Sequence, residues 1–252
     1  MALLHVHRYG PPDGEPLLAI HGVTAHGRRF RRLAEEALPA RRVLAVDLRG
    51  HGASDWDPPW SLDRHLADLG ETLDHLGVER TDVIGHSFGG LLATSLLATS
   101  PHRVGRVVLL DPAMSLDPVL AREAAEETLD DESWASLEEG AEARAASQVA
   151  AATEAARVDA MISLVQGADG RFRRRFSRPA VITGWGEMAR PLPELPRNRE
   201  ILLVTAGRAP FVNDRVRAAL PDATEHVLDC GHVMLWEAFD DVSSLVQAFL
   251  AR

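Results

Sequence analysis

Apolar residues occur along this chain in short runs, which alternate with longer stretches in which apolar and polar positions follow a helical period. Short apolar runs between turn residues are typical of buried β-strands. Six such runs span residues 17–20, 43–46, 81–84, 107–110, 201–205 and 226–228. Three helical stripes consist of Phe30, Leu33, Ala34 and Leu38, of Leu62, Leu66, Leu69, Leu73 and Leu76, and of Val242, Leu245, Val246 and Phe249. The alternation predicts an α/β fold with a mostly parallel sheet covered by helices on both faces.

One interval is too long for an ordinary connection between parallel strands. About 90 residues separate the strand that ends near Asp111 from the one that begins near Ile201, whereas a crossover needs about a dozen or more. The intervening sequence is rich in Ala, Glu and Leu from 118 to 165 and rich in Arg from 171 to 178. We therefore expect a core formed by residues 1–114 and 196–252, with a helical cap formed by residues 115–195.

Composition limits the kinds of molecule that the protein is expected to bind and the compartment in which it is expected to act. The net charge of −10 argues against nucleic-acid binding, because that binding relies on basic residues that neutralise phosphates. All 27 basic residues are Arg.

A single cysteine, Cys230, excludes an internal disulfide, and the N-terminus lacks the apolar core of a signal peptide. No apolar run approaches the roughly 20 residues of a membrane helix. We expect a cytoplasmic protein with a small-molecule partner; the sequence leaves the oligomeric state open.

A candidate nucleophile follows the third predicted strand. Gly85-His86-Ser87-Phe88-Gly89 has the form G-x-S-x-G, and a helical stripe of leucines follows it. In this strand-turn-helix context the serine sits on a sharp turn with its hydroxyl exposed. The flanking glycines are needed because side chains there would collide across the turn. Ser87 is the predicted nucleophile.

A candidate base lies near the C-terminus. His232 follows the last predicted strand, and Ser87 also follows a predicted strand. Both residues are therefore expected to lie at the same edge of the sheet. A neutral imidazole can take the serine proton and return it to the leaving group. The neighbouring Cys230 is expected to be a small buried residue.

Four motifs in one order carry a family resemblance. The segments 21–24 (HGVT), 47–54 (DLRGHGAS) and 85–90 (GHSFGG), together with Gly231-His232, closely resemble the α/β-hydrolase fold family outside the cap. The resemblance implies that the residue after His21-Gly22 and the residue after the nucleophile donate backbone N–H groups to an oxyanion. Those residues are Val23 and Phe88.

The third member of a catalytic triad is not at its usual place. The family's acid follows the next-to-last strand in a G-x-x-D pattern, but the corresponding position after Gly207 holds Pro210. Some members place the acid after the strand beside the nucleophile strand, which here ends at Asp111. We expect Asp111 to orient His232, as the acid does in a Ser-His-Asp triad. Asp214, or no acid at all, remains an alternative.

The predicted activity is hydrolysis of a small carboxylic ester or lactone through an acyl-enzyme, without a cofactor or metal. The resemblance also allows thioester, amide or carbon–carbon bond hydrolysis, and a non-catalytic ligand-binding protein on the same scaffold is a further alternative. The cap should form a lid, because ligands bind at the carboxyl edge of such sheets. His21 is structural or contacts the substrate. Further candidate pocket residues are Trp134, Met161, Phe172, Phe176, Trp185 and Met188.

Overall fold

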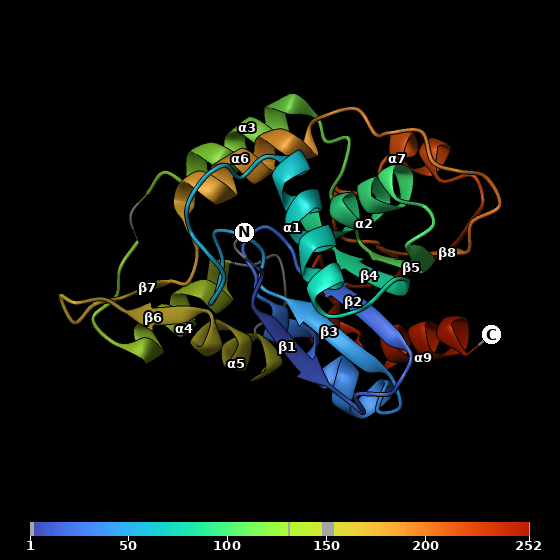
Figure 1. Cartoon of the computed structure of the whole chain (residues 1–252). Helices are drawn as coiled ribbons and strands as arrows, with labels where there is room; N and C mark the ends of the chain where they lie inside the picture. Colours follow the sequence, from blue (N-terminus) through green and yellow to red (C-terminus); the bar gives the residue numbers. More distant parts are fainter. Residues whose placement is uncertain (1–2, 131, 148–153, 252) are drawn as a thin grey trace.

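A computed structural model describes residues 3–130, 132–147 and 154–251 of the chain. Its centre is a twisted sheet in which seven strands of the described part are ordered β1-β3-β2-β4-β5-β8-β9 (Figure 1). Every neighbouring pair is parallel except β1 with β3. The strands are β1 (Val6–Tyr9), β2 (Pro16–Ile20), β3 (Arg42–Val46), β4 (Thr81–His86), β5 (Val104–Leu110), β8 (Ile201–Ala206) and β9 (Ala223–Leu228). The mostly parallel sheet predicted from the apolar runs is confirmed.

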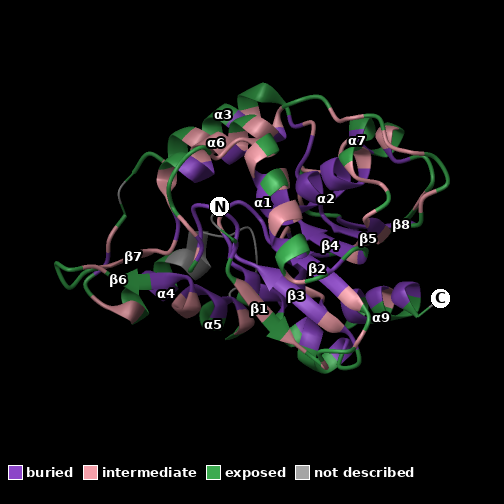
Figure 2. Cartoon of the chain, viewed as in Figure 1, coloured by how far each residue is buried: buried purple, intermediate pink, exposed green. Residues whose placement is uncertain are grey.

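Side chains that alternate along each strand form two cores, one on each face of the sheet. In β2, Leu18 and Ile20 join one cluster of buried residues, whereas Leu17 and Ala19 join the other. Helices α1 (Leu62–His75), α2 (Phe88–Thr99) and α7 (Asp214–Ala219) contribute to the first cluster. The 3₁₀ turn η1 (Gly27–Phe30), the π-helical turn η2 (Leu33–Ala37) and helices α8 (Met234–Glu237) and α9 (Phe239–Leu250) contribute to the second. Figure 2 shows the resulting buried sheet between layers that are exposed outside.

Two parts of the core differ from the prediction. The stripe at Phe30 to Leu38 forms the short turns η1 and η2 and not one α-helix. Strand β1 was not predicted, because its sequence Val-His-Arg-Tyr carries polar residues and lacks an apolar run. It pairs antiparallel with β3 at the edge of the sheet, where polar side chains can reach water.

The chain between β5 and β8, residues 111–200, is termed the insert. It contains α3 (Pro118–Glu127), α4 (Leu137–Ser147), α5 (Glu154–Ile162), the hairpin β6 (Leu164–Gln166) and β7 (Phe172–Arg174), and α6 (Arg178–Met188). Helices α3 and α6 lie side by side, and α4 and α5 pack with the hairpin (Figure 1). The expectation of a helical cap does not hold for the start of the Arg-rich part, because β7 pairs there with β6.

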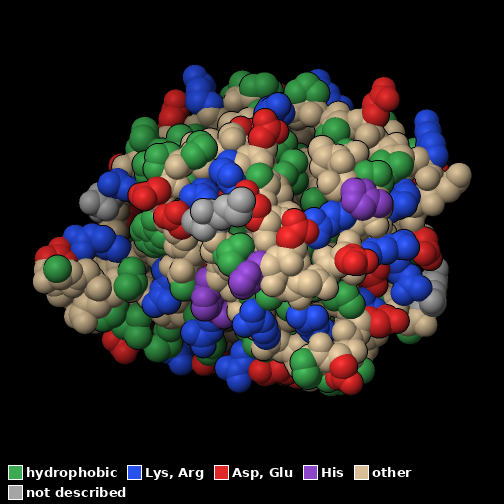
Figure 3. All heavy atoms as spheres, viewed as in Figure 1, with side chains coloured by type: hydrophobic (Ala, Val, Ile, Leu, Met, Phe, Trp, Pro, Cys, Tyr) green, Lys and Arg blue, Asp and Glu red, His purple; other side chains and the backbone are tan. Residues whose placement is uncertain are grey.

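The outer surface carries charges of both signs. Figure 3 shows acidic and basic side chains interspersed with small apolar areas on one face of the molecule. No helix in the described part of the chain combines the length and apolarity needed to cross a membrane.

Candidate active site

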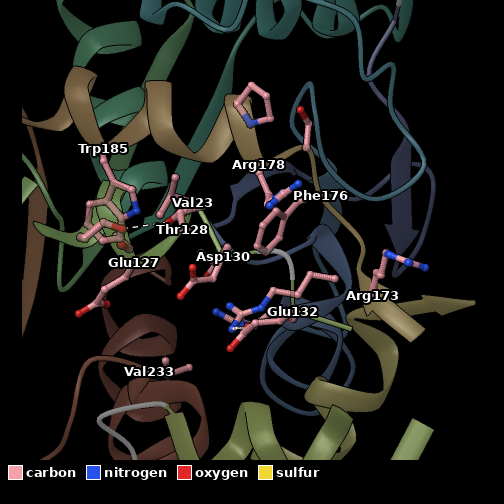
Figure 4. Close-up of a pocket in the computed structure, with 18 of the residues that line it drawn as sticks. Val23, Glu127, Thr128, Asp130, Glu132, Arg173, Phe176, Arg178, Trp185 and Val233 are labelled. Atoms are coloured by element: carbon pink, nitrogen blue, oxygen red, sulfur yellow. Dashed lines mark hydrogen bonds and ion pairs between the residues drawn. The ribbon is translucent and has the colours of Figure 1, made fainter. Parts of the chain in front are cut away.

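A cavity of about 790 Å³ lies between the carboxyl edge of the sheet and the insert (Figure 4). The core contributes residues that follow the carboxyl ends of four parallel strands: Gly22 after β2, Ser87 after β4, Phe211 after β8 and His232 after β9. The insert contributes the opposite wall. The carboxyl edge is the expected ligand site in an open α/β sheet, because loops from several strands converge there.

Ser87 occupies a strained turn between β4 and α2. Its φ of 56° and ψ of −120° lie in a region that non-glycine residues rarely adopt. The turn is possible because a Cβ at Gly85 would come within 2.2 Å of the Gly89 carbonyl oxygen, and one at Gly89 within 2.0 Å of the Ile20 carbonyl oxygen. The glycines thus let the two sides of the turn approach and place Ser87 at the N-terminus of α2, beside the cavity.

His232 is bonded to Asp111. The distance from His232 Nδ1 to Asp111 Oδ2 is 2.6 Å, and the Asp111 side chain is fully buried. The N–H of Ala206, at the end of β8, donates to the other carboxylate oxygen at 3.1 Å. Asp214, the alternative acid, is a fully exposed residue at the start of α7, and Arg217 lies 3.8 Å from its carboxylate. The structure therefore brings Asp111, and not Asp214, against His232.

The loop around Val23 is held by two buried histidines. His21 Nδ1–H donates to the Gly22 carbonyl at 2.7 Å, while His21 Nε2 accepts from the Leu48 N–H at 2.9 Å. His51 Nε2–H donates to the Val23 carbonyl at 2.7 Å. Burial lowers the pKa of both imidazoles, and lowers that of His21 well below its usual range. Both peptides that flank Val23 are therefore oriented by buried histidines.

Phe88, the second predicted oxyanion donor, is the first residue of α2. The first four N–H groups of an α-helix have no acceptor within the helix. The N–H of Phe88 is therefore available for an external acceptor beside Ser87.

The predicted pocket residues lie in different places. Trp185 and Phe176 line the cavity. His21, Trp134, Met161, Phe172 and Met188 are not among the described residues that line it. His21 and Met188 are fully buried, and Trp134 forms an isolated β-bridge with Phe172. Trp134 is also buried, whereas Met161 and Phe172 are half-buried.

Several lining residues were missed by sequence reasoning. Val233 could have been found from its place beside His232, and Phe211 from its place after β8. The charged lining residues are Arg29, Glu127, Asp130, Glu132, Arg173, Arg174 and Arg178. All but Arg29 lie in the acidic stretch 123–142 or the Arg-rich stretch 171–178, whose composition is equally typical of a solvated surface. Figure 4 shows the carboxylates of Glu127, Asp130 and Glu132 together with Arg178 around the cavity. The wall therefore carries charges of both signs.

Arg29 connects the cavity wall to the insert. Its guanidinium Nη2 lies 2.7 Å from Asp159 Oδ2 in α5, and both side chains are less than 10% exposed. The same guanidinium stacks on the ring of Trp236 in α8, 4.8 Å from its centroid. The ion pair thus joins three elements that are distant in sequence.

Three residues beside β1 and β3 could ligate a metal ion. Ligand atoms of His5, His7 and Asp47 lie within 4.8 Å of one another, because β1 pairs with β3, which ends just before Asp47. The sequence analysis, which expected no metal, did not bring these residues together. Asp47 already accepts hydrogen bonds from the N–H groups of Gly27 and Ala53, which hold its carboxylate in the fold.

Comparison with known proteins agrees with the fold. A family model described as alpha/beta hydrolase fold matches residues 15–207. Over 98% of its length the chain is 38% identical to "Lipase LipV" of Mycobacterium tuberculosis, of which 97% is covered. It is 26% identical to "Esterase YbfF" of Escherichia coli, with 94% of each chain covered.

A solved structure titled as E-2-(acetamidomethylene)succinate hydrolase superposes with a TM-score of 0.89 at 19% identity, covering 99% of this chain and 95% of the other. At that identity the likeness concerns the fold alone. The family model and the relatives at the sequence level go further: this chain belongs to the α/β-hydrolase fold family.

Proposed function

We propose that this protein is a serine hydrolase that cleaves small carboxylic esters or lactones through an acyl-enzyme on Ser87. The observation that carries the proposal is the 2.6 Å contact between His232 and buried Asp111 beside a cavity that Ser87 also lines. Relatives named lipase and esterase support an ester substrate.

The first half-reaction acylates the enzyme. Ser87 Oγ attacks the substrate carbonyl carbon while His232 Nε2 takes the hydroxyl proton. The carbonyl π electrons move to oxygen, and the N–H groups of Val23 and Phe88 donate to the resulting oxyanion. The intermediate collapses, the bond to the leaving oxygen breaks, and His232 gives its proton to that oxygen. An ester gives a free alcohol and the Ser87 ester; with a lactone the new hydroxyl stays on the acyl group that Ser87 carries.

The second half-reaction releases the acid. Water attacks the Ser87 ester while His232 Nε2 takes a proton from it, and the same N–H groups stabilise the second oxyanion. Collapse of this intermediate breaks the bond to Ser87 Oγ, which regains its proton from His232. Asp111 accepts from Nδ1–H throughout, which leaves Nε2 unprotonated in the resting enzyme and stabilises the imidazolium in the transition states.

The insert acts in this proposal as a lid. It supplies one wall of the cavity, and a volume of about 790 Å³ is within the range of sites for small molecules. Trp185 and Phe176 offer apolar surface for the substrate, and the charged residues offer polar contacts.

The proposal is tested with a fluorophosphonate probe and a panel of nitrophenyl esters. We expect the probe to label Ser87, and Ser87→Ala to lower kcat by at least about 10³ while the fold is retained. The heat-denatured protein serves as the control for nonspecific labelling.

Near-normal ester turnover by the Ser87→Ala variant would exclude Ser87 as the nucleophile. A folded wild-type protein that is inert to both probe and esters would favour a non-catalytic binder. Labelling without ester turnover would direct the search to thioester, amide and carbon–carbon substrates.

A further inference from the structure

His86 directly precedes Ser87 and contacts His232, which lies 146 residues further along the chain. Its Nε2 lies 2.9 Å from the backbone carbonyl oxygen of His232. The two imidazole rings are also in contact, with centroids 4.7 Å apart and planes inclined by 37°. One side chain thus joins the turn that carries Ser87 to the loop that carries His232.

The hydrogen bond defines the state of the His86 ring. A carbonyl can only accept, so His86 Nε2 carries the proton and donates it. Burial, and then the proximity of His232, lower the pKa of His86 well below its usual range, so the ring is neutral. Its Nδ1 is buried and has no hydrogen-bond partner among the described residues. An unpaired buried acceptor costs about 1–3 kcal/mol, so packing alone does not explain a histidine here.

The loop of His232 needs support on its backbone as well as on its ring. Asp111 holds the ring through Nδ1. The loop lies between β9 and α8 and contains Gly231, whose N–H donates to Glu237 at 3.1 Å. His86 bonds the backbone of the following residue, because its Nε2–H donates to the carbonyl oxygen of His232. The loop is therefore fixed on both sides of the His232 Cα.

We propose that His86 is a positioning residue that sets the distance between Ser87 Oγ and His232 Nε2 by tying the two loops together. The inference rests on the proposed function, because it assumes that His232 is the base for Ser87. His86 does not exchange protons in the reaction; it acts through the backbone carbonyl of His232. Reacting groups must be held to a fraction of an ångström, since a misplacement of about 1 Å can cost about 10²-fold in rate.

The test compares two substitutions that differ in one hydrogen bond. His86→Phe keeps an aromatic ring in the buried site but cannot donate to the His232 carbonyl. His86→Gln places an amide N–H near the position of Nε2 and can restore the bond. We expect His86→Phe to lower kcat per titrated active site about 10- to 100-fold with KM changed less than about threefold, and His86→Gln to recover most of the loss.

A spectroscopic readout tests the same point without turnover. The proton shared by His232 Nδ1 and Asp111 should give a strongly downfield ¹H resonance in the wild type. We expect this resonance to broaden through faster exchange with water in His86→Phe and to persist in His86→Gln. Leu97→Ala, a buried change in α2 that creates a cavity, is the control for lost stability. It should leave kcat per titrated site and the resonance unchanged.

The possible failures can be told apart. If Ser87→Ala and His232→Ala retain activity, the proposed function is wrong. If those variants are inactive while folded His86→Phe keeps full kcat and an unchanged downfield resonance, only the role of His86 is wrong. If His86→Phe and His86→Gln lose kcat equally, the hydrogen bond is not the cause and the proposal is also overturned.

Discussion

Two residues of the candidate site share an unusual backbone conformation. Ser87 has a φ of 56° and Asp111 a φ of 41°, and each follows a central strand of the sheet. Such conformations cost about 1–3 kcal/mol and persist where neighbours fix them. The Ser87 carbonyl accepts from the N–H groups of Gly90 and Ala113, and the Asp111 N–H donates to the Val204 carbonyl at 2.7 Å. The hydrogen bonds of the sheet edge thus hold Ser87 beside the cavity and the buried Asp111 carboxylate against His232.

The contact of Asp111 with His232 leads to a prediction about two aspartates. We expect Asp111→Asn to lower kcat about 10²- to 10⁴-fold, because the amide favours the wrong tautomer of His232. Asp214→Asn should cost less than about tenfold, because Asp214 is fully exposed and lies against Arg217, whereas His232 is bonded to Asp111. Steady-state kinetics on one ester, with circular dichroism to verify folding, measures both. The opposite ranking would move the acid to Asp214.

Single residues of the candidate site could be predicted from the sequence where a motif determines the backbone conformation. The glycines around Ser87 predict the turn because no other residue fits it, and the missing carboxylate after Gly207 directed attention to Asp111. The contact of His86 with His232 could not be predicted, since it depends on how two loops meet in space.

At the scale of elements, the buried pair Arg29–Asp159 attaches α5 of the insert to the core. Removing one member of a buried ion pair costs about 3–5 kcal/mol, because the other charge is left without compensation. Arg29 also lines the cavity and stacks on Trp236, so the pair couples the position of α5 to the wall of the site.

We therefore expect Asp159→Ala to lower the free energy of unfolding by about 3–5 kcal/mol and to reduce amide hydrogen-exchange protection in α5. Glu154→Ala is the matched control on the same helix, because Glu154 forms an exposed pair with Arg157. An exposed pair contributes about 0–1 kcal/mol. Equal effects of the two substitutions would show that Asp159 does not hold the insert.

The insert also shows what periodicity cannot predict. Met188 and Trp185 both lie near the end of α6, yet Met188 is fully buried in the core whereas Trp185 lines the cavity. An apolar side chain turned toward a core and one turned toward a cavity give the same sequence pattern. The hairpin β6–β7 was missed for a related reason, because its strands are three residues long.

At the scale of the whole molecule, several buried histidines favour the folded state only when they are neutral. Burial is the largest cause that lowers the pKa of His21, His51, His65 and His86, and it brings that of His65 to about 3. In the unfolded chain these groups take up protons near the ordinary value of 6.5. The unfolded state therefore binds more protons below that value, and stability is lost as the pH falls from 6.5 toward 3.

Urea unfolding should show this dependence. His65 alone should lower the free energy of unfolding by about 2 kcal/mol between pH 7.5 and pH 5, and the other buried histidines should add to it. His65→Leu should reduce the slope of stability against pH, whereas His75→Gln, a change at an exposed residue of α1, should not. An unfolding free energy that is constant between pH 7.5 and pH 5 would contradict the assignment.

The fold could be predicted from the sequence more completely than the site, because it depends on many repeated signals. Each central strand carries an apolar run that is buried on both faces, and each strand-to-helix alternation implies a parallel neighbour. The edge strand β1 and the broken helix at Phe30 to Leu38 escaped prediction because tertiary contacts, and not local pattern, decide them.

The chemistry of Cys230 has a practical consequence. This single thiol of the chain is 1% exposed, and burial raises its pKa to about 11, so the folded protein should be inert to maleimides near neutral pH. A cysteine introduced at Val165, which is 37% exposed and lines the cavity from the insert, would then be the sole labelled position. A fluorophore attached there would report movements of the insert in real time, with no need to alter the segment next to His232.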